Sequence, residues 1–462
     1  MRGKRKKGNL KERRNKDANI KKIKTKETAN NKKKAVLGPG AKKLDDSFHV
    51  VGMSASAGGL EAFEQFFRNM PPDSGMAFIL VPHLDPTHKS IMVDLIKRCT
   101  RMEVVEAKNG VRIRPNNIYV IPPNNDLSVL HERLHLMELV APRGQRHPID
   151  YFLRSLADDQ GERAVCIILS GTGTDGTVGL KAIKESGGMV VVQDPASAKY
   201  DGMPRSAIDT GLVDYVLPPE KMPEALIKYV RYSKVRTVKK DSEIVAKMPD
   251  SLQKILILLR SQTGHDFSLY KKNTILRRIE RRMVVHQVDK LPDYVRYMQE
   301  HPHEINLLFK EIIIGVTNFF RDKDAFEVLK TKVYPHLLKE RPPDDNIRIW
   351  VVGCSTGEEA YSIAITLREY IVKEDLDVKV QIFATDIDED AIETARQGIY
   401  PESIAVDVSV ERLKRFFTKR GSTYHISKEI REMLVFAPQD VIKDPPVFQA
   451  GHDKLPQPAD LF

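Results

Sequence analysis

The sequence is poor in cysteine and has no long apolar run. Its 462 residues include three cysteines, Cys99, Cys166 and Cys354, an odd number without metal-ligand spacing. This usage favours reduced thiols over a disulfide framework, and no metal site is expected. No apolar run approaches the about 18 residues that a membrane span needs, and the N-terminus has no hydrophobic segment of the signal-peptide type. The sequence therefore predicts a cytoplasmic protein without a membrane span.

The excess of positive charge is confined to the N-terminus. The net charge is +11, and residues 1–43 hold 18 Lys/Arg against three acidic residues, which leaves −4 for the rest of the chain. Because this segment has no aromatic residue to stack on bases, we interpret it as a solubilising tail, and nucleic acid is not an expected partner. A nucleic-acid-associated protein that uses the tail remains an alternative.

The length and the patterning divide the rest of the chain. A chain of 462 residues is too long for one ordinary core. Buried-strand and helix patterns alternate through the first half, which predicts an α/β domain with a parallel sheet. A helical segment and a second, shorter α/β pattern follow. The predicted organisation is a disordered basic tail (1–45), an α/β domain (46–230), a linker (231–250), a small all-helical domain (251–316), a partial Rossmann-like domain (317–448) and an irregular tail (449–462).

The first half is organised around a strand that runs into a loop of small residues. Val50 to Ala55 reads as a buried strand, and a helical pattern with Leu60 and Phe63 follows Gly58-Gly59. Such a turn places one short side chain beside a helix N-terminus. The hydroxyl of Ser56 is therefore a nucleophile, a phosphate contact or a plain N-cap.

A second glycine-rich turn, Gly171 to Gly176, allows two interpretations. It fits the G-x-G-x-x-G pattern of a dinucleotide fold, with Asp194 placed to bind a ribose. However, the charge of Asp175 within the loop would repel a pyrophosphate. In the alternative, Asp175 orients His83, which deprotonates Ser56, and all three residues follow the ends of predicted parallel strands.

These residues resemble the catalytic domain of chemotaxis receptor methylesterases (CheB-type). The similar motifs are Val51 to Ala62, Val81-Pro82-His83, Asn109-Gly110, Leu169 to Gly176 and Gly202-Met203-Pro204. The resemblance implies that Ser56 is the nucleophile, His83 the base and Asp175 the residue that orients it. It also implies hydrolysis of glutamate γ-methyl esters on chemoreceptor helices or related signalling proteins, without a cofactor.

Two positions depart from the family's pattern. Ser54 stands where the family usually has Gly, so we expect its hydroxyl to crowd the turn. Thr172 stands where Met is common near the oxyanion site. Neither departure removes a member of the triad.

The second half resembles chemotaxis receptor methyltransferases (CheR-type). Leu276 to Met283 and Val316 to Arg321 resemble the N-terminal part of that family, and Ile349 to Ser362 and Phe383 to Tyr400 resemble the start of its S-adenosylmethionine-binding fold. A glycine-containing turn and an acid at the second strand's end suit a nucleoside. By resemblance the cofactor contacts are Thr317, Arg321, Glu358, Glu359 and Asp386.

Two arginine pairs, Arg277-Arg278 and Arg281-Arg282, stand out in the helical segment. They are either a solvated helix face or a surface that docks on acidic receptor helices. Both interpretations remain open at the level of sequence.

The residues after Asp444-Pro445-Pro446 are polar and rich in proline, where the family pattern continues into further strands. We expect a methyltransferase half that is incomplete and inactive alone, because such a sheet exposes apolar edges. The chain is thus predicted to be an adaptation protein with a methylesterase and a methyltransferase-like region. The alternative is a receptor-binding signalling scaffold whose enzyme activity has decayed.

Overall fold

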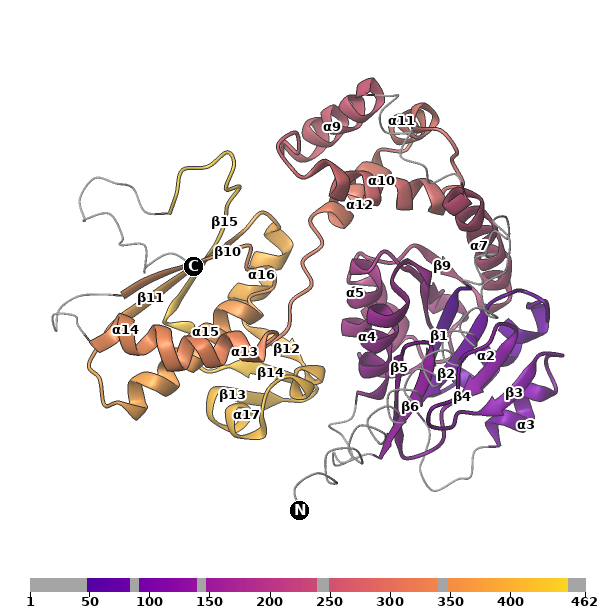
Figure 1. The fold of residues 1–462 in the computed structure, drawn as a ribbon, viewed down its shortest axis with the longest axis horizontal. Helices are drawn as coiled ribbons and strands as arrows, with labels where there is room; N and C mark the ends of the chain where they lie inside the picture. The colour runs from indigo at the N-terminus through magenta and orange to yellow at the C-terminus, as the bar shows by residue number, and fades with distance from the viewer. Residues whose placement is uncertain (1–47, 84–90, 139–146, 239–248, 340–346, 448–462) are drawn as a thin grey trace, which may run out of the picture. The chain divides into compact units, whose positions relative to one another are not determined.

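The computed structural model describes residues 48–83, 91–138, 147–238, 249–339 and 347–447 (Figure 1). The predicted basic tail and the predicted C-terminal irregular tail lie outside these residues.

The first region is built on a seven-stranded sheet in the order β3-β4-β2-β1-β7-β8-β9, with every neighbouring pair parallel. The central strands are continuous apolar runs because helices cover both faces of the sheet. This confirms the predicted parallel α/β fold. The strands are β1 (Val50–Ala55), β2 (Ala77–Pro82), β3 (Glu103–Glu106), β4 (Asn117–Val120), β7 (Ala164–Ile168), β8 (Met189–Gln193) and β9 (Tyr215–Leu217).

Alternate side chains of each strand enter two separate cores. One core joins β1 to α2 (Gly59–Asn69) and α7 (Met222–Val238), and the other joins β1 to α4 (Pro148–Gln160) and α5 (Thr177–Glu185). Helix α7 continues to Val238, within the range expected to be a linker. The remaining elements are α3 (Met92–Lys97), the hairpin β5 (Asn125–Leu130) and β6 (Arg133–Glu138), and α6 (Gly202–Ile208).

The next region is all-helical, as predicted. It consists of α9 (Pro249–Thr263), α10 (Lys272–Val285), α11 (Leu291–Glu300) and α12 (Pro302–Ile312), which share one apolar core.

The arginines of α10 are not a solvated face, so that interpretation was wrong for three of the four. Arg278, Arg281 and Arg282 are buried, and only Arg277 is exposed. The helix turns these three side chains inward because carboxylates and backbone carbonyls surround them. Arg281 pairs with Asp214 at 2.6 Å and also with Glu311, and Arg278 donates to the carbonyl of Lys184 at 3.1 Å.

The last region holds a second parallel sheet, β10-β11-β15, which has three strands among the described residues. Its strands are β10 (Ile347–Val352), β11 (Val380–Asp386) and β15 (Leu434–Pro438), and α15 (Glu358–Lys373) crosses from the first to the second. An antiparallel sheet, β12 (Ile399–Pro401), β14 (Thr423–Ile426) and β13 (Phe417–Arg420), accompanies it. The other helices are α13 (Lys323–Val328), the π-helix η4 (Leu329–Val333), α14 (Tyr334–Lys339), α16 (Glu389–Gln397), the 3-10 helix η5 (Glu402–Val406), α17 (Val410–Phe416) and α18 (Lys428–Arg431).

Candidate active site

Ser56 and His83 follow neighbouring parallel strands at the same edge of the sheet. Ala55, the last residue of β1, is opposite Pro82, the last residue of β2. The N–H of His83 donates to the carbonyl of Ala55 at 2.8 Å, and the N–H of Ser56 donates to the carbonyl of Ser170 at 3.0 Å. Because carboxyl ends of parallel strands lie together, the sheet itself fixes these two residues side by side.

Asp175 lies in the loop between β7 and α5 and holds the imidazole of His83. The Nε2 of His83 is 2.8 Å from Oδ2 of Asp175. The carboxylate also accepts from the N–H groups of Ile149 at 3.2 Å and Asp150 at 3.0 Å, in the first turn of α4. These donors fix the orientation of the carboxylate, whose side chain is only 5% exposed.

The contact through Nε2 leaves Nδ1 of His83 for another partner. With Nε2–H donating to the carboxylate, Nδ1 carries a lone pair that can accept a proton. No hydrogen bond joins the Ser56 hydroxyl to this imidazole among the described residues, and Ser56 is half-buried. Such contacts commonly tighten only when substrate binds.

The backbone at position 171 passes so close to Ser56 that only glycine fits there. A Cβ on Gly171 would stand 2.2 Å from Sδ of Met203 and 2.9 Å from Cβ of Ser56. The neighbouring Ser170 contributes too, because its hydroxyl donates to the carbonyl of Ala57 at 2.9 Å and accepts from the N–H of Tyr200 at 3.0 Å. The sequence interpretation did not include Ser170, although its place between a strand and a glycine-rich turn was the available signal.

Ser54 does not crowd the turn. It lies inside β1, fully buried, in register with Val81 on one side and Ile168 on the other. The expectation that it would crowd the turn was therefore wrong, because its side chain points into the sheet's core. Its hydroxyl has no hydrogen-bond partner among the described residues. Thr172, the other departure, is exposed.

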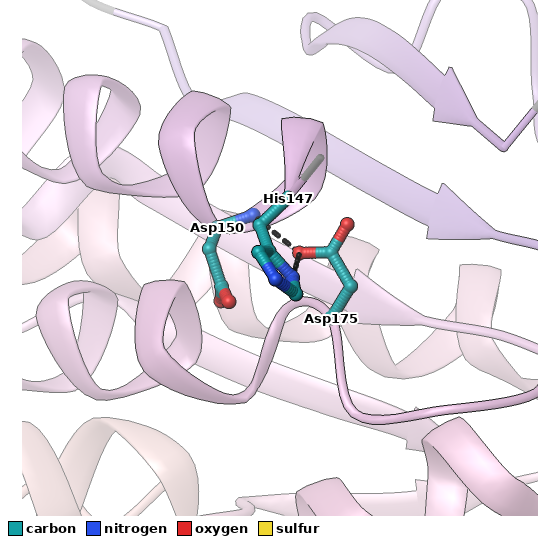
Figure 2. A group of neighbouring side chains, drawn as sticks. All are labelled: His147, Asp150 and Asp175. Atoms are coloured by element: carbon teal, nitrogen blue, oxygen red, sulfur yellow. Dashed lines mark hydrogen bonds and ion pairs between the residues drawn. The ribbon is translucent and has the colours of Figure 1, made fainter. Parts of the chain in front are cut away.

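Two further polar residues lie next to Asp175, and the sequence interpretation missed both (Figure 2). Nδ1 of His147 is 3.9 Å from Oδ1 of Asp175, and Asp150 accepts from the N–H of Gly179 at 2.7 Å. Burial raises the pKa of Asp150 well above its usual range, and the charge of Asp175 raises it further. Burial also lowers the pKa of His147, which Asp175 partly offsets. The available signal was the start of α4, where His147 and Asp150 share the first turn around Pro148.

Asp194, which the dinucleotide interpretation placed to bind a ribose, makes a hydrogen bond within its own loop. Asp194 follows β8, and its side chain accepts from the N–H of Ala196 at 3.0 Å in a short 3-10 turn. Its carboxylate therefore caps a turn of its own loop.

The second site is formed by the turn between β10 and α15. Asp386, at the end of β11, accepts from the N–H of Ser355 at 2.7 Å and from the N–H of Asp388 at 2.9 Å. Gly353 has a φ of 70°, and a Cβ there would meet no atom within 4 Å. Open space over a glycine turn beside a fixed carboxylate fits a nucleoside with ribose hydroxyls.

Of the other residues expected to contact the cofactor, Glu359, Thr317 and Arg321 belong to segments that meet at this turn. Glu358 makes a different contact. Glu359 lies in the first turn of α15, where burial raises its pKa, Asp322 raises it further and Arg321 opposes the rise. The segment that precedes α13 reaches this turn, since the hydroxyl of Ser355 donates to the carbonyl of Gly315 at 3.2 Å. Thr317 and Arg321 belong to that segment. The carboxylate of Glu358 instead accepts from the hydroxyl of Thr356 at 2.6 Å, and burial raises its pKa.

A parallel sheet with a serine, a histidine and a buried aspartate at its carboxyl edge is typical of α/β enzymes that use a serine hydroxyl. Comparison with known families specifies the class. Residues 51–226 match the model of the CheB methylesterase, residues 250–313 that of the CheR methyltransferase all-alpha domain, and residues 315–450 that of the CheR methyltransferase SAM binding domain. The chain belongs to the CheB methylesterase family and joins that domain to the two CheR domains.

Individual relatives cover different parts of the chain. A Leptospira interrogans protein, named as a candidate protein-glutamate methylesterase/protein-glutamine glutaminase, is 30% identical over 183 residues, 39% of this chain and 95% of that protein. An uncharacterized 104.1 kDa protein of Rhodobacter capsulatus is 36% identical over 378 residues, 77% of this chain. The chain spans only 39% of the length of that relative.

A solved structure is also similar. The Thermotoga maritima CheB methylesterase catalytic domain has 28% identity and a TM-score of 0.38, and the match covers 40% of this chain and 100% of that one. In the described part of the chain, no helix has the length and apolar character needed to cross a bilayer.

Proposed function

We propose that the chain hydrolyses glutamate γ-methyl esters on chemoreceptor helices, with Ser56 as nucleophile, His83 as general base and Asp175 as the residue that orients it. The single observation that carries this proposal is the 2.8 Å contact between His83 and the buried Asp175, at a strand end adjacent to that of Ser56. Relatives named protein-glutamate methylesterase/protein-glutamine glutaminase support the substrate class.

In the proposed reaction, each proton transfer passes through His83. The hydroxyl of Ser56 attacks the ester carbonyl while Nδ1 of His83 takes its proton, and Asp175 stabilises the imidazolium through Nε2. The imidazolium then protonates the leaving methoxide, which departs as methanol. Water, deprotonated by His83, attacks the acyl-serine and releases the glutamate carboxylate and the free hydroxyl. Backbone N–H groups at the turn hold the oxyanion in both steps.

The second half takes S-adenosylmethionine, whose bound sulfonium supplies an activated methyl group. We propose that Asp386 accepts hydrogen bonds from the ribose hydroxyls, and that Thr317, Arg321 and Glu359 contact the cofactor around the same turn. Glu358 supports the turn through its bond with Thr356. The expectation that this half is incomplete and inactive alone stays a prediction.

The test is methanol release from a methylated receptor fragment by the purified chain. Ser56→Ala should abolish release, whereas Ser54→Ala, two residues earlier and within β1, should retain it. The opposite pattern would overturn the assignment of the nucleophile. If the wild-type chain binds the receptor but releases no methanol, the alternative of a receptor-binding scaffold with decayed activity gains support.

A further inference from the structure

Three groups that commonly bind metals surround the aspartate of the proposed triad. The ligand atoms of His147, Asp150 and Asp175 all lie within 4.8 Å of one another. Figure 2 draws the imidazole of His147 between the two carboxyl groups, with Asp150 in the first turn of α4, His147 just before that helix and Asp175 on the facing loop. The sequence separates Asp175 from the other two residues by about one βα unit, so only the fold assembles this group.

Three polar atoms of this group have no hydrogen-bond partner among the described residues. They are Nδ1 and Nε2 of His147 and Oδ2 of Asp150. The side chain of His147 is 9% exposed and Asp150 is 2% exposed. Buried polar atoms in native proteins are almost always paired with protein, water or an ion. Here the ring nitrogens of His147 and one oxygen of the Asp150 carboxyl lack a well-formed hydrogen bond among the described residues, although the backbone and charge of Glu402 also act on His147.

Two of the three groups are buried carboxyls. Burial and the charge of Asp175 raise the pKa of Asp150, and Arg154 opposes this rise. Asp175 has three hydrogen-bond donors, from His83, Ile149 and Asp150, but Asp150 has only backbone donors and no cation paired with it among the described residues. A bound cation would satisfy the free oxygen and the free imidazole together.

The donor set selects the kind of cation. Imidazole suits zinc and neighbouring transition metals, whereas magnesium and calcium prefer oxygen donors alone. Zinc bonds of about 2.0–2.2 Å to nitrogen and oxygen place two tetrahedral ligand atoms about 3.4 Å apart. The three ligand atoms here lie within 4.8 Å of one another, so a bound ion would draw the side chains together. Three protein ligands leave one tetrahedral position for water.

We propose that His147, Asp150 and Asp175 form a binding site for a divalent transition metal ion such as Zn²⁺, and that its occupancy inhibits the esterase. The inhibition rests on the proposed function. The metal takes Oδ1 of Asp175, the oxygen nearer His147, while His83 contacts Oδ2. A cation on the carboxylate cancels the negative charge that stabilises the His83 imidazolium, so kcat should fall while KM changes little.

The experiment uses the full chain and Co²⁺ as a spectroscopic probe. The wild type should bind one Co²⁺ with the visible absorption bands of a tetrahedral N/O site, and Zn²⁺ should displace it. His147→Ala should lose these bands, and the isosteric Asp150→Asn should weaken them. His135→Ala, on β6 and outside the group, is the matched control and should leave them unchanged. Circular dichroism identifies any variant that fails to fold. If one of the two metal-site variants fails to fold, the Co²⁺ bands of the other test the site.

Esterase assays with and without Zn²⁺ test the second part. Zinc should lower kcat of the wild type and of His135→Ala by more than about tenfold, because the orienting carboxylate is worth up to about 10⁴-fold in kcat. The activity of His147→Ala should not respond to zinc. Absence of Co²⁺ bands in the wild type, or bands that persist in His147→Ala, would overturn the site. Co²⁺ binding by a chain that releases no methanol would leave the site standing and reject the proposed function instead.

Discussion

At the scale of the residue, Ser54 and Ser56 show how two positions decide the role of a hydroxyl. Ser54 is fully buried within β1 with an unpaired hydroxyl, and Ser56 stands just past the strand's end. Ser54 lies between Val81 of β2 and Ile168 of β7, whereas Ser56 lies beyond the last residue of β1. The same hydroxyl group lowers the stability of the fold at Ser54 and is a candidate nucleophile at Ser56.

Ser54→Ala should therefore stabilise the protein. An unpaired buried hydroxyl costs about 1–3 kcal/mol, and alanine removes it without adding volume. We expect the free energy of unfolding, measured by urea denaturation, to rise by about 1 kcal/mol. Ser170→Ala is the control: its hydroxyl makes hydrogen bonds to the Ala57 and Tyr200 backbones, so that variant should lose stability. Equal losses in both variants would contradict this account.

At the scale of the element, the site depends on turns that bring backbones very close together. The loop after β7 contacts the turn after β1 only because Gly171 has no side chain. Helix α4 contributes in another way, since its first N–H groups hold Asp175. A loop and a helix terminus thus position groups that no single element carries.

Gly171→Ala should lower esterase activity. The added methyl group would lie 2.9 Å from Cβ of Ser56, so the turn must shift, and a displacement of about 1 Å can cost about 100-fold in rate. The measurement is kcat/KM for methanol release, and Ser54→Ala, which is expected to retain activity, is the control. Activity of Gly171→Ala within a factor of two of the wild type would show that the close approach is not needed.

The pairing of α10 with α12 should make the helical region sensitive to acid. Burial favours the neutral form of Glu304, but hydrogen bonds from His286 and Arg282 outweigh it and lower the pKa to about 2 from an ordinary 4.5. A depressed carboxyl pKa stabilises the fold above the unfolded value, and this stability is lost as pH falls from about 4.5 towards 2. The loss amounts to at most about 3 kcal/mol.

Glu304→Gln should remove this dependence. The variant is less stable at neutral pH, because Arg282 loses a buried partner, but its stability should fall less between pH 5 and 2 than that of the wild type. Urea denaturation at a series of pH values measures the two slopes. Parallel slopes would exclude Glu304 as the titrating group.

At the scale of the whole molecule, a buried network of six charges links distant parts of the sequence. Its three cations and three anions balance, and each of these side chains is at most 5% exposed. The network connects α5 and the segment before β9 to α10 and α12, so helices of the CheR all-alpha domain share charges with the CheB domain. Its members are Lys184, Asp214, Arg281, Arg282, Glu304 and Glu311.

Arg281→Gln should destabilise the chain, and Arg277→Gln should not. Removal of one partner from a buried ion network leaves uncompensated charge and costs about 3–5 kcal/mol, whereas an exposed position costs within about 0.5 kcal/mol. The two arginines lie one turn apart on the same helix, which makes them a matched pair. Urea denaturation of both variants measures the difference. A small effect at Arg281 would show that the network contributes little to stability.

The sequence by itself determined the α/β class, the order of strands and helices, and the strand ends on which Ser56 and His83 stand. These features depend on local apolar periodicity and on turn residues, which are legible along the chain. Only the tertiary structure decided the rest: the burial of Arg281, the place of Ser54 inside the sheet, and the meeting of His147 with Asp175. Each depends on contacts between segments far apart in sequence, and burial and pairing at such contacts leave no periodic signal in the chain.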